Sequence, residues 1–328
     1  MRVMITGATG FVGGWTAKAI HDSGHTLRFF VRSPQRLAKA AAFFGIDATE
    51  VVVGDIGDAA AVARALDSCD AVVHAAAEVA LHHTEDADAL VKRNLTGSRN
   101  VIGQAVAAGI DPIVHVSSAA VLWTQSGAVM RTDLPPTGGA GAYGHAKTAV
   151  ESYVRDLQAQ GAPIAITYPT GVAGPAAAGH LGEAGDGVLT LADIGVLGRT
   201  AGLSLVDVRD LADLHVRLLE PGHRARRFVA GGHQAFGRTL AQTLTRASGH
   251  RVRYLPIPNT ALLGLGRLAD RHRTLVPRKL DQLSESAAQY LLYPPNPDNS
   301  AAEALGVVFR PIAETIDAVF GTNRTPSD

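Results

Sequence analysis

The chain has 328 residues, of which 46% are hydrophobic and 18% charged, a composition typical of a globular protein with one large domain or two smaller ones. Its 30 basic and 30 acidic residues give a formal charge of zero, which offers no electrostatic attraction for nucleic acid or an anionic membrane. The single cysteine, Cys69, excludes an internal disulfide framework, and no apolar run has the length of a membrane span or the pattern of a signal peptide. We therefore expect a cytoplasmic protein.

Short apolar runs rich in Val and Ile alternate with longer helical patterns through the first half of the chain. The apolar runs predict strands at 3–5, 27–31, 51–53, 71–74, 112–116 and 164–168. The longer patterns predict helices at 11–22, 34–44, 58–67, 86–108 and 142–160. Strands that are apolar at every residue and separated by helices indicate a parallel sheet covered on both faces. The predicted fold class is α/β, with a Rossmann-type doubly wound sheet.

Residues 6–14, TGATGFVGG, place four glycines where the first strand meets the first helix. Gly7, Gly10 and Gly13 at this point would permit a tight turn, close approach of the backbone to a pyrophosphate, and close helix–strand packing. The helix N-terminus would add unpaired N–H groups and a favourable dipole for phosphates. A plain glycine-rich turn is the alternative, but the alternating strand–helix series that follows favours a dinucleotide site.

The ends of the second and third strands bear on the choice of nucleotide. Arg32 follows the second strand, and the next carboxylate along the chain is Asp47. An arginine here favours the 2′-phosphate of NADP over the ribose of NAD, and the Ser33 hydroxyl could add to the same site. A solvated surface arginine is the alternative. Asp55, after the third strand, could accept a hydrogen bond from the adenine amino group or cap the next helix.

A candidate reactive group follows the fifth strand. Tyr143 and Lys147 are four residues apart in a predicted helix and so share one face. A nearby ammonium would lower the pKa of the tyrosine hydroxyl from about 10, which would make Tyr143 a usable acid or base. Ser117 and Ser118 end the fifth strand, where a hydroxyl could hold a substrate carbonyl oxygen or simply form a turn. His74, His82 and His83 lack metal-ligand spacing, and we expect no metal site.

After Pro169 the alternation ends, and the chain becomes rich first in Gly and Ala and later in Pro. The runs at 203–208 and 228–230 could return to the sheet. We therefore expect a nucleotide-binding domain at 1–170 with returning segments near 203–231, and a smaller, interleaved C-terminal substrate domain formed by 171–202 and 232–328. The apolar stretch 260–265 could line a pocket for a lipophilic substrate or form an ordinary buried helix.

In their order along the chain these motifs resemble the extended short-chain dehydrogenases/reductases, the NAD-dependent epimerase/dehydratase family. The resemblance covers nearly the whole chain. It rests on TGATGFVG at 6–13, GDIGD at 54–58, AVVHAAA at 71–77, NLTGSRNV at 94–101, VSSAAV at 116–121, YGHAK at 143–147, YPTGVAGP at 168–175 and LVDVRDLA at 205–212. Within the family, VRSP at 31–34 is similar to the dihydroflavonol 4-reductase group, in which an arginine at this point accompanies NADP.

The resemblance implies catalytic roles for four residues. Tyr143 would be the acid/base, Lys147 would bind the nicotinamide ribose and lower the Tyr143 pKa, and Ser118 would orient the carbonyl. Asn94 would support the hydrogen-bond network, although helix packing explains it almost as well. The residues that the resemblance and the motifs place along the cofactor are Gly7, Thr9, Gly10, Phe11, Val12, Gly13, Arg32, Ser33, Asp55, Ile56, Ala75, Ala76, Ala77, Tyr143, Lys147, Pro169, Thr170 and Val172.

The resemblance implies an NADP-dependent oxidoreductase that transfers hydride between nicotinamide and a small or lipophilic ketone, aldehyde or alcohol, and the family makes a homodimer an expectation. A sugar-nucleotide epimerase holding NAD is the alternative. It is disfavoured by Arg32 and would bind a diphosphate, for example through Arg251 or Arg253. Ala119-Ala120 after Ser118 disfavours dehydration, and the retained Tyr143–Lys147 pair disfavours a non-catalytic, nucleotide-sensing regulator. Two departures from the family, Tyr168 and Leu122-Trp123, are expected to leave the substrate side apolar.

Overall fold

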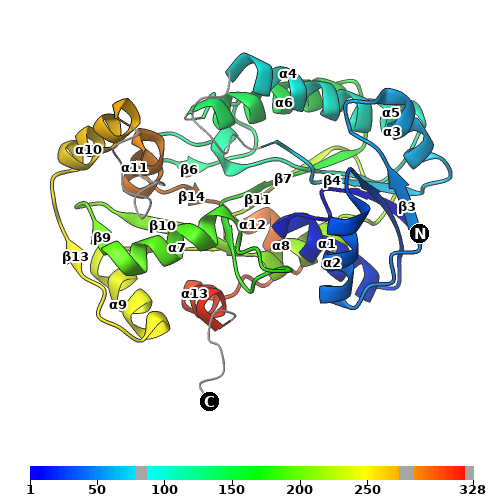
Figure 1. Ribbon diagram of the computed structural model, residues 1–328. Helices are drawn as coiled ribbons and strands as arrows, with labels where there is room; N and C mark the ends of the chain where they lie inside the picture. Colours follow the sequence, from blue (N-terminus) through cyan, green and yellow to red (C-terminus); the bar gives the residue numbers. More distant parts are fainter. Residues whose placement is uncertain (79–86, 140, 273–283, 322–328) are drawn as a thin grey trace.

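The computed structural model describes residues 1–78, 87–139, 141–272 and 284–321. Its centre is a seven-stranded sheet in which every neighbouring pair of strands is parallel (Figure 1). The order across this sheet is β11-β7-β5-β4-β1-β2-β3. The strands are β1 (Arg2–Thr6), β2 (Thr26–Val31), β3 (Glu50–Val53), β4 (Ala71–His74), β5 (Ile113–Val116), β7 (Ile164–Pro169) and β11 (Arg226–Ala230). The predicted α/β doubly wound architecture is confirmed.

Helices cover both faces of this sheet, which is why its central strands are buried on either side. In β1, Val3 and Ile5 pack into the core on one face and Met4 into the core on the other. One face carries α1 (Phe11–Asp22), α2 (Pro34–Phe44) and α8 (Val208–Arg217); the other carries α3 (Ala59–Leu66), α4 (Ala87–Ser98), α5 (Gln104–Ala107) and α6 (Gly141–Ala159) (Figure 1). A π-helical turn, Arg99–Gly103, joins α4 to α5 within the expected helix at 86–108.

The two segments expected to return to the large sheet behave differently. Residues 228–230 lie in β11, which pairs with β7 as predicted. The prediction for 203–208 is wrong: β10 (Gly202–Asp207) instead joins a separate three-stranded sheet, parallel to β8 (Gly171–Ala173) and antiparallel to β12 (His233–Phe236). Because β11 occupies the edge beside β7, β10 pairs with the short strand that continues the chain beyond the end of β7.

The remaining elements pack around this small sheet and form a third apolar core with Leu240, Leu244 and Ile316 among its members. The helices here are α7 (Gly182–Ile194), α9 (Gly237–Ser248), α10 (Asn259–Arg271), α11 (Glu285–Leu292) and α13 (Ile312–Gly321), whereas α12 (Ser300–Glu303) packs against β11 of the large sheet. Two short parallel pairs join distant segments: β6 (Val129–Met130) with β14 (Asn296–Pro297), and β9 (Val196–Leu197) with β13 (Tyr254–Leu255). Among the described helices, none combines the length and the apolar character needed to cross a membrane.

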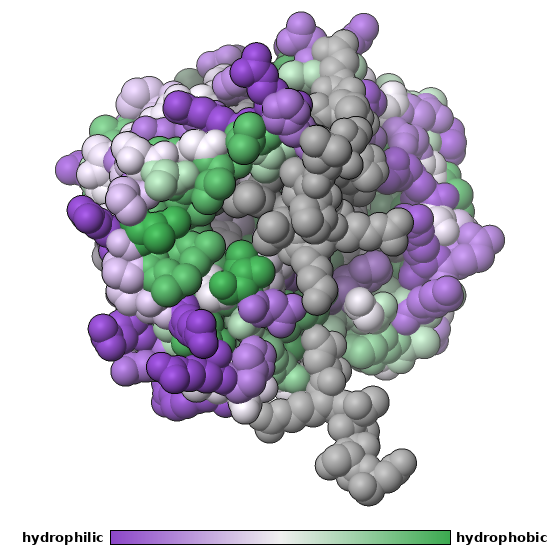
Figure 2. Space-filling view, turned by 60° about the vertical axis from the view of Figure 1, so that its left-hand side comes forward, coloured by the Kyte–Doolittle hydropathy of each residue, from purple (hydrophilic) through white to green (hydrophobic). Residues whose placement is uncertain are grey.

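The side of the molecule that carries α10 comes forward in Figure 2, where apolar side chains gather in a patch bordered by polar ones. In α10, Leu262 is 2% exposed, whereas Leu265 and Leu268 are 48% and 55% exposed. The helix therefore turns one apolar side inward and another to solvent. The two interpretations of 260–265, a pocket lining and a buried helix, each describe part of the segment. Leu262 is buried in the helix and also lines the cavity described next.

Candidate active site

A cavity of about 710 Å³ lies where β1, β4, β5 and β7 of the large sheet end, and it extends toward the small sheet. In a doubly wound sheet this is the edge where ligands bind. One part of the lining comes from the glycine turn and the strand ends, and the other from α7, β10, α10 and α11. The predicted residues that line the cavity are Gly7, Gly10, Phe11, Val12, Gly13, Ala75, Ala77, Ser118, Tyr143, Lys147, Pro169, Thr170 and Val172.

A different physical constraint explains the presence of glycine at each of the three motif positions. Gly7 has a φ of +79°, and a Cβ there would lie 2.8 Å from the backbone nitrogen of Ala76. A Cβ on Gly13 would lie 2.2 Å from the Gly7 carbonyl oxygen, so α1 packs directly on the turn. Gly10 has a negative φ, and a Cβ there would meet only the Gly7 oxygen, at 3.4 Å. The fold thus requires glycine at 7 and 13, while Gly10 keeps the cavity side of the turn open.

The N-terminus of α1 suits an anionic ligand. Gly10 is its N-cap, and no side chain caps the first turn. Phe11, Val12 and Gly13, the first residues of the helix, line the cavity with the small side chains of Ala75 and Ala77 opposite. Free N–H groups and the helix dipole at this point fit the pyrophosphate of a dinucleotide. The predicted cofactor residues that are not in the lining are Thr9, Ala76, Arg32, Ser33, Asp55 and Ile56. The Ala76 N–H donates to the Thr6 hydroxyl at 3.2 Å.

Beyond this turn, Arg32 has a side chain that is 67% exposed and faces two acids. Its Nη1 lies 3.9 Å from Oδ2 of Asp55 and 3.7 Å from Oε1 of Glu78. Ser33 caps α2, accepting from the Arg36 N–H at 3.3 Å. A 2′-phosphate at Arg32 would therefore compete with two carboxylates.

Asp55 and Ile56, which follow β3, both make contacts within the protein. The Asp55 carboxylate accepts from the Gly57 N–H at 2.7 Å, while Asp58 is the N-cap of α3. The alternative in which Asp55 caps this helix is therefore wrong. Ile56 lies against Gly97 of α4, where a Cβ would come within 2.5 Å of the isoleucine side chain. Asp55 keeps its second carboxylate oxygen, Oδ2, on the side of Arg32.

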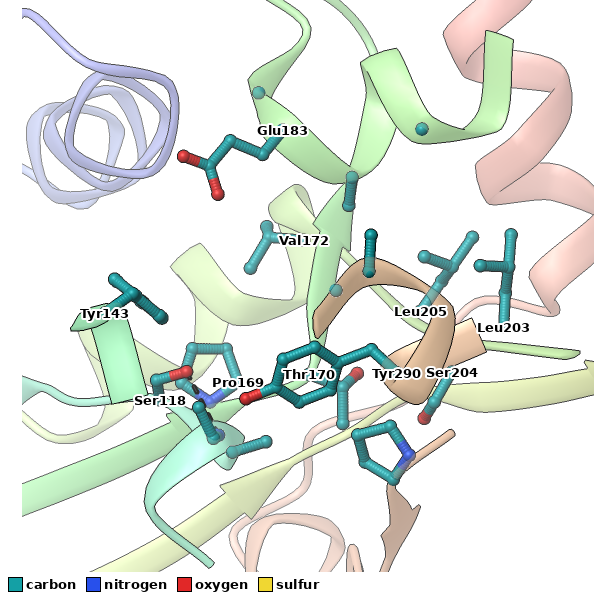
Figure 3. A pocket seen from close by; sticks show the side chains of 18 of the residues that line it. Ser118, Tyr143, Pro169, Thr170, Val172, Glu183, Leu203, Ser204, Leu205 and Tyr290 are labelled. Atoms are coloured by element: carbon teal, nitrogen blue, oxygen red, sulfur yellow. Dashed lines mark hydrogen bonds between the residues drawn. The ribbon is translucent and has the colours of Figure 1, made fainter. Parts of the chain in front are cut away.

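The predicted reactive residues come together at the edge of the cavity (Figure 3). Tyr143 and Lys147 lie on α6, and Ser118 lies between β5 and a short 3₁₀ helix, Ala119–Val121. The Ser118 side chain lies next to Tyr143 and accepts a hydrogen bond from the Ala120 N–H at 3.2 Å. Lys147 Nζ donates to the Val116 carbonyl at 3.3 Å. Two hydroxyl groups are thus placed side by side where a carbonyl oxygen could bind both.

Protonation of this group differs from the expectation in one respect. Burial raises the pKa of Tyr143 to about 12, the Ser118 hydrogen bond opposes that rise, and the charge of Glu183 adds to it. The predicted lowering of the Tyr143 pKa by Lys147 is therefore wrong for the protein alone: burial is the largest cause of the shift, and Lys147 is not among the groups that affect this pKa. Burial also lowers the pKa of Lys147 to about 8, against the opposing charges of Glu151 and Glu183. At neutral pH Tyr143 carries its proton and is ready to donate it.

Asn94 lies outside the cavity lining and holds the chain beside it. Its side-chain oxygen accepts from the Glu78 N–H at 2.9 Å, and its amide group donates to the carbonyls of Glu78 and Leu90, each at 3.1 Å. These bonds fix the segment that follows β4 and its three alanines. The bonds of Asn94 thus hold backbone near Ala75 and Ala77 of the cavity lining, and its part in an active-site hydrogen-bond network stays a prediction.

Several cavity residues escaped the sequence analysis because they come from the irregular second half of the chain. Glu183, in the first turn of α7, is a carboxylate in the lining, and burial raises its pKa. Tyr290, on α11, lines the cavity and packs against Trp123 with ring centroids 4.6 Å apart. Leu122, Trp123 and Tyr168, which were expected to leave the substrate side apolar, are themselves buried outside the lining, so other residues give that side its character.

The outer part of the cavity is mostly apolar, although Glu183, Thr190, Ser204 and Tyr290 also line it. Its lining includes Leu191, Ile194, Leu197, Leu203, Leu205, Leu262 and Leu291. Within the described ranges, the lining holds no arginine, and Lys147 is its one cationic side chain. Arg251 and Arg253, the candidates for holding a diphosphate, lie outside it. Of the histidines considered for a metal, His74 is buried and bonded to Thr6 and Ser98, while His82 and His83 lie outside the described residues.

Comparison with known proteins finds relatives that match most of the chain. The family model of the NAD dependent epimerase/dehydratase family matches residues 3–252. Sterol demethylase protein B of Methylococcus capsulatus is 27% identical over 89% of this chain and 88% of its own. A Synechocystis protein that its name assigns provisionally to the dihydroflavonol 4-reductases is 29% identical over 80% of this chain and 75% of its own. UDP-glucose 4-epimerase of Azospirillum brasilense is 29% identical over 76% and 78%.

Solved structures show the same fold. The crystal structure of gox2253 superposes with a TM-score of 0.77 at 25% identity and covers 98% of this chain and 97% of that chain. The UDP-glucose 4-epimerase of Thermus thermophilus, solved in complex with NAD, has a TM-score of 0.72 at 20% identity over the full length of both chains. Vestitone reductase from alfalfa has a TM-score of 0.71 at 18% identity over 98% and 97%. Reductases and epimerases therefore share this architecture.

Proposed function

This chain belongs to the NAD dependent epimerase/dehydratase family of nicotinamide-nucleotide enzymes, and within it we propose that the protein is an NADPH-dependent carbonyl reductase for a small or lipophilic ketone or aldehyde. The observation that carries the proposal is the combination of the Ser118 and Tyr143 hydroxyl groups with an outer cavity lined mostly by apolar side chains, leucines above all. A sugar nucleotide carries a diphosphate, and the described outer lining offers it no cationic side chain.

The proposed roles follow from the geometry. Nicotinamide supplies or accepts the hydride when the cofactor is bound. Ser118 would hydrogen-bond the carbonyl oxygen and polarise it, and Tyr143, protonated at neutral pH, would donate the proton that converts that oxygen into a hydroxyl. Lys147 would hold the nicotinamide ribose. We further propose that 171–202 and 232–328 form the substrate-binding part, since α7, α10 and α11 supply most of the outer lining.

Nucleotide content and turnover test this proposal together. Freshly purified protein would be denatured and its released nucleotide identified, and NADPH oxidation would then be followed with a panel of ketones and aldehydes. We expect an exchangeable site that prefers NADPH and turnover with apolar carbonyl compounds. Stoichiometric, non-exchanging NAD together with interconversion of UDP-glucose and UDP-galactose would contradict the proposal and establish an epimerase instead.

A further inference from the structure

The face of α6 that carries Tyr143 and Lys147 continues, four residues at a time, with Glu151 and Arg155. Glu151 is fully buried, although a carboxylate is rarely found in that position without partners. We propose that Glu151 is a positioning residue, which fixes the catalytic helix against the ends of β5 and β7 and provides the negative charge that faces the Lys147 ammonium. The effect of Glu151 on catalysis rests on the proposed function. Its effect on the charge of Lys147 does not depend on that function.

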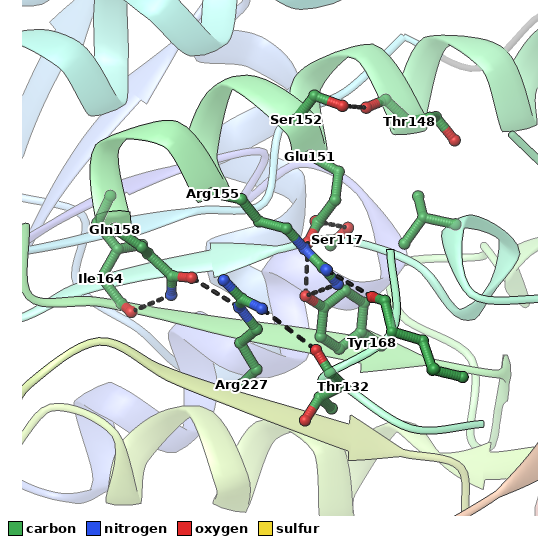
Figure 4. Close-up of polar contacts among 12 residues, drawn as sticks. Ser117, Thr132, Thr148, Glu151, Ser152, Arg155, Gln158, Ile164, Tyr168 and Arg227 are labelled. Atoms are coloured by element: carbon green, nitrogen blue, oxygen red, sulfur yellow. Dashed lines mark hydrogen bonds and ion pairs between the residues drawn. The ribbon is translucent and has the colours of Figure 1, made fainter. Parts of the chain in front are cut away.

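The hydrogen bonds of Glu151 carry the positioning part of this inference (Figure 4). Oε2 accepts from the Ser117 hydroxyl at 2.7 Å, and Oε1 accepts from Nε of Arg155 at 2.7 Å and from the Tyr168 hydroxyl. Arg155 also donates to the Tyr168 hydroxyl at 3.0 Å and to the Leu134 carbonyl at 2.7 Å. One carboxylate thus ties α6 to the residue after β5 and to a residue within β7.

This arrangement explains why the two adjacent serines are not equivalent. Consecutive residues of an extended chain point to opposite sides. The Ser117 hydroxyl donates to Glu151, whereas the Ser118 side chain lies beside Tyr143 in the cavity lining. Any movement of Glu151 would therefore be transmitted to the strand end that presents Ser118, as well as to the helix that presents Tyr143.

The charges around Lys147 carry the electrostatic part. Lys147 is half-buried in the cavity lining, and an ammonium withdrawn from solvent tends to lose its proton. The charged groups that oppose this loss are Glu151 on the same helix and Glu183 on α7. His74 on β4 and His115 on β5 also lie near Lys147, but burial keeps both imidazoles neutral around pH 7. Glu151 is fixed by three donors, whereas Glu183 sits in the cavity lining.

Substitution Glu151→Gln tests the inference because it removes the charge and nearly preserves the shape. The readout is the pH dependence with which a small amine-reactive anhydride labels Lys147, quantified by mass spectrometry of the peptide. We expect the labelling midpoint to fall by about one pH unit or more. Labelling needs no turnover, so a failure of the reductase assignment would leave this result intact. In an active enzyme, the alkaline limb of the kcat/KM profile should move in the same direction.

Two controls separate charge from structure. Tyr168→Phe removes one hydrogen bond to the carboxylate and keeps its charge, so the Lys147 midpoint should stay at its wild-type value. If Glu151→Gln alone does not fold, the double variant Glu151→Gln/Arg155→Gln removes both buried charges together, which proteins tolerate better than an unpaired charge. A folded single or double variant whose Lys147 midpoint equals that of the wild type would overturn the inference.

Discussion

Arg32 shows, for a single residue, how surroundings change the meaning of a motif. The sequence places an arginine after the second strand, where it favours a 2′-phosphate. The structure adds Asp55 and Glu78 within 4 Å of the same guanidinium. Neither acid is adjacent to Arg32 in the sequence, because each follows a different strand of the sheet. The proposed preference for NADPH over NADH would therefore require the 2′-phosphate to compete with two carboxylates for one guanidinium.

Arg32→Asp is expected to weaken NADPH binding by at least about tenfold and NADH binding much less, because a charge-assisted hydrogen bond contributes about 1.5–3 kcal/mol. Fluorescence titration with both nucleotides measures this. In the companion variant Glu78→Gln, the arginine loses one competing carboxylate and NADPH should bind more tightly. Equal losses for both nucleotides in Arg32→Asp would show that the guanidinium does not contact the 2′-phosphate.

Tyr143 provides the sharpest test of the proposed chemistry. Tyr143→Phe removes the proton donor, and we expect kcat to fall by about 10²- to 10⁴-fold while NADPH affinity stays within a few fold. Tyr153→Phe is the matched control, because Tyr153 lies on the same helix but packs against Arg99, away from the cavity. Wild-type turnover in the Tyr143 variant would rule out its role as the acid.

At the scale of elements, two glycines in the turn between β1 and α1 serve different purposes that the sequence motif does not distinguish. Gly13 allows α1 to pack on the turn, and Gly10 keeps the cavity open. Gly13→Ala would drive a methyl group into the Gly7 carbonyl, and we expect a loss of about 1–3 kcal/mol of stability with a lower Tm. Gly10→Ala has room within the protein, so its Tm should stay unchanged. Its methyl group would still enter the cavity lining, and nucleotide affinity should fall about tenfold or more.

Thermal unfolding and nucleotide titration of these two variants provide the check. Because Gly10 has a negative φ, alanine there brings no backbone strain. If Gly10→Ala binds the nucleotide as tightly as the wild type, the cofactor does not approach this turn. If it is as unstable as Gly13→Ala, then packing alone explains the motif.

At the scale of the whole molecule, His215 links α8 to its neighbours. Its ring nitrogens contact the Thr16 hydroxyl of α1 at 2.9 Å and the Thr167 hydroxyl of β7 at 3.2 Å. Burial lowers the pKa of His215 to about 3, whereas an unfolded chain has histidine near 6.5. The unfolded state therefore binds the extra proton, and stability falls as the pH drops from about 6.5 toward 3.

This linkage predicts a loss of about 2 kcal/mol from His215 between pH 7 and pH 5. His215→Gln does not titrate, so its free energy of unfolding should fall correspondingly less over this range. Urea unfolding at both pH values measures the difference. Parallel pH dependences in the two proteins would mean that His215 is not neutral in the folded state.

The sequence by itself determined the doubly wound sheet, the nucleotide turn and the Ser118, Tyr143 and Lys147 group, because strand–helix alternation and short local spacings fix them. The tertiary structure decided which residues from distant parts of the sequence lie next to these groups. Glu183 and Tyr290 reach the cavity from helices that carry no motif, and Tyr168 turns away from it toward Glu151. The tertiary structure also decided that residues 203–208 join the small sheet and not the large one, because the partner of a strand depends on which sheet edge is free. Burial, a property of the whole fold, set the protonation of Tyr143.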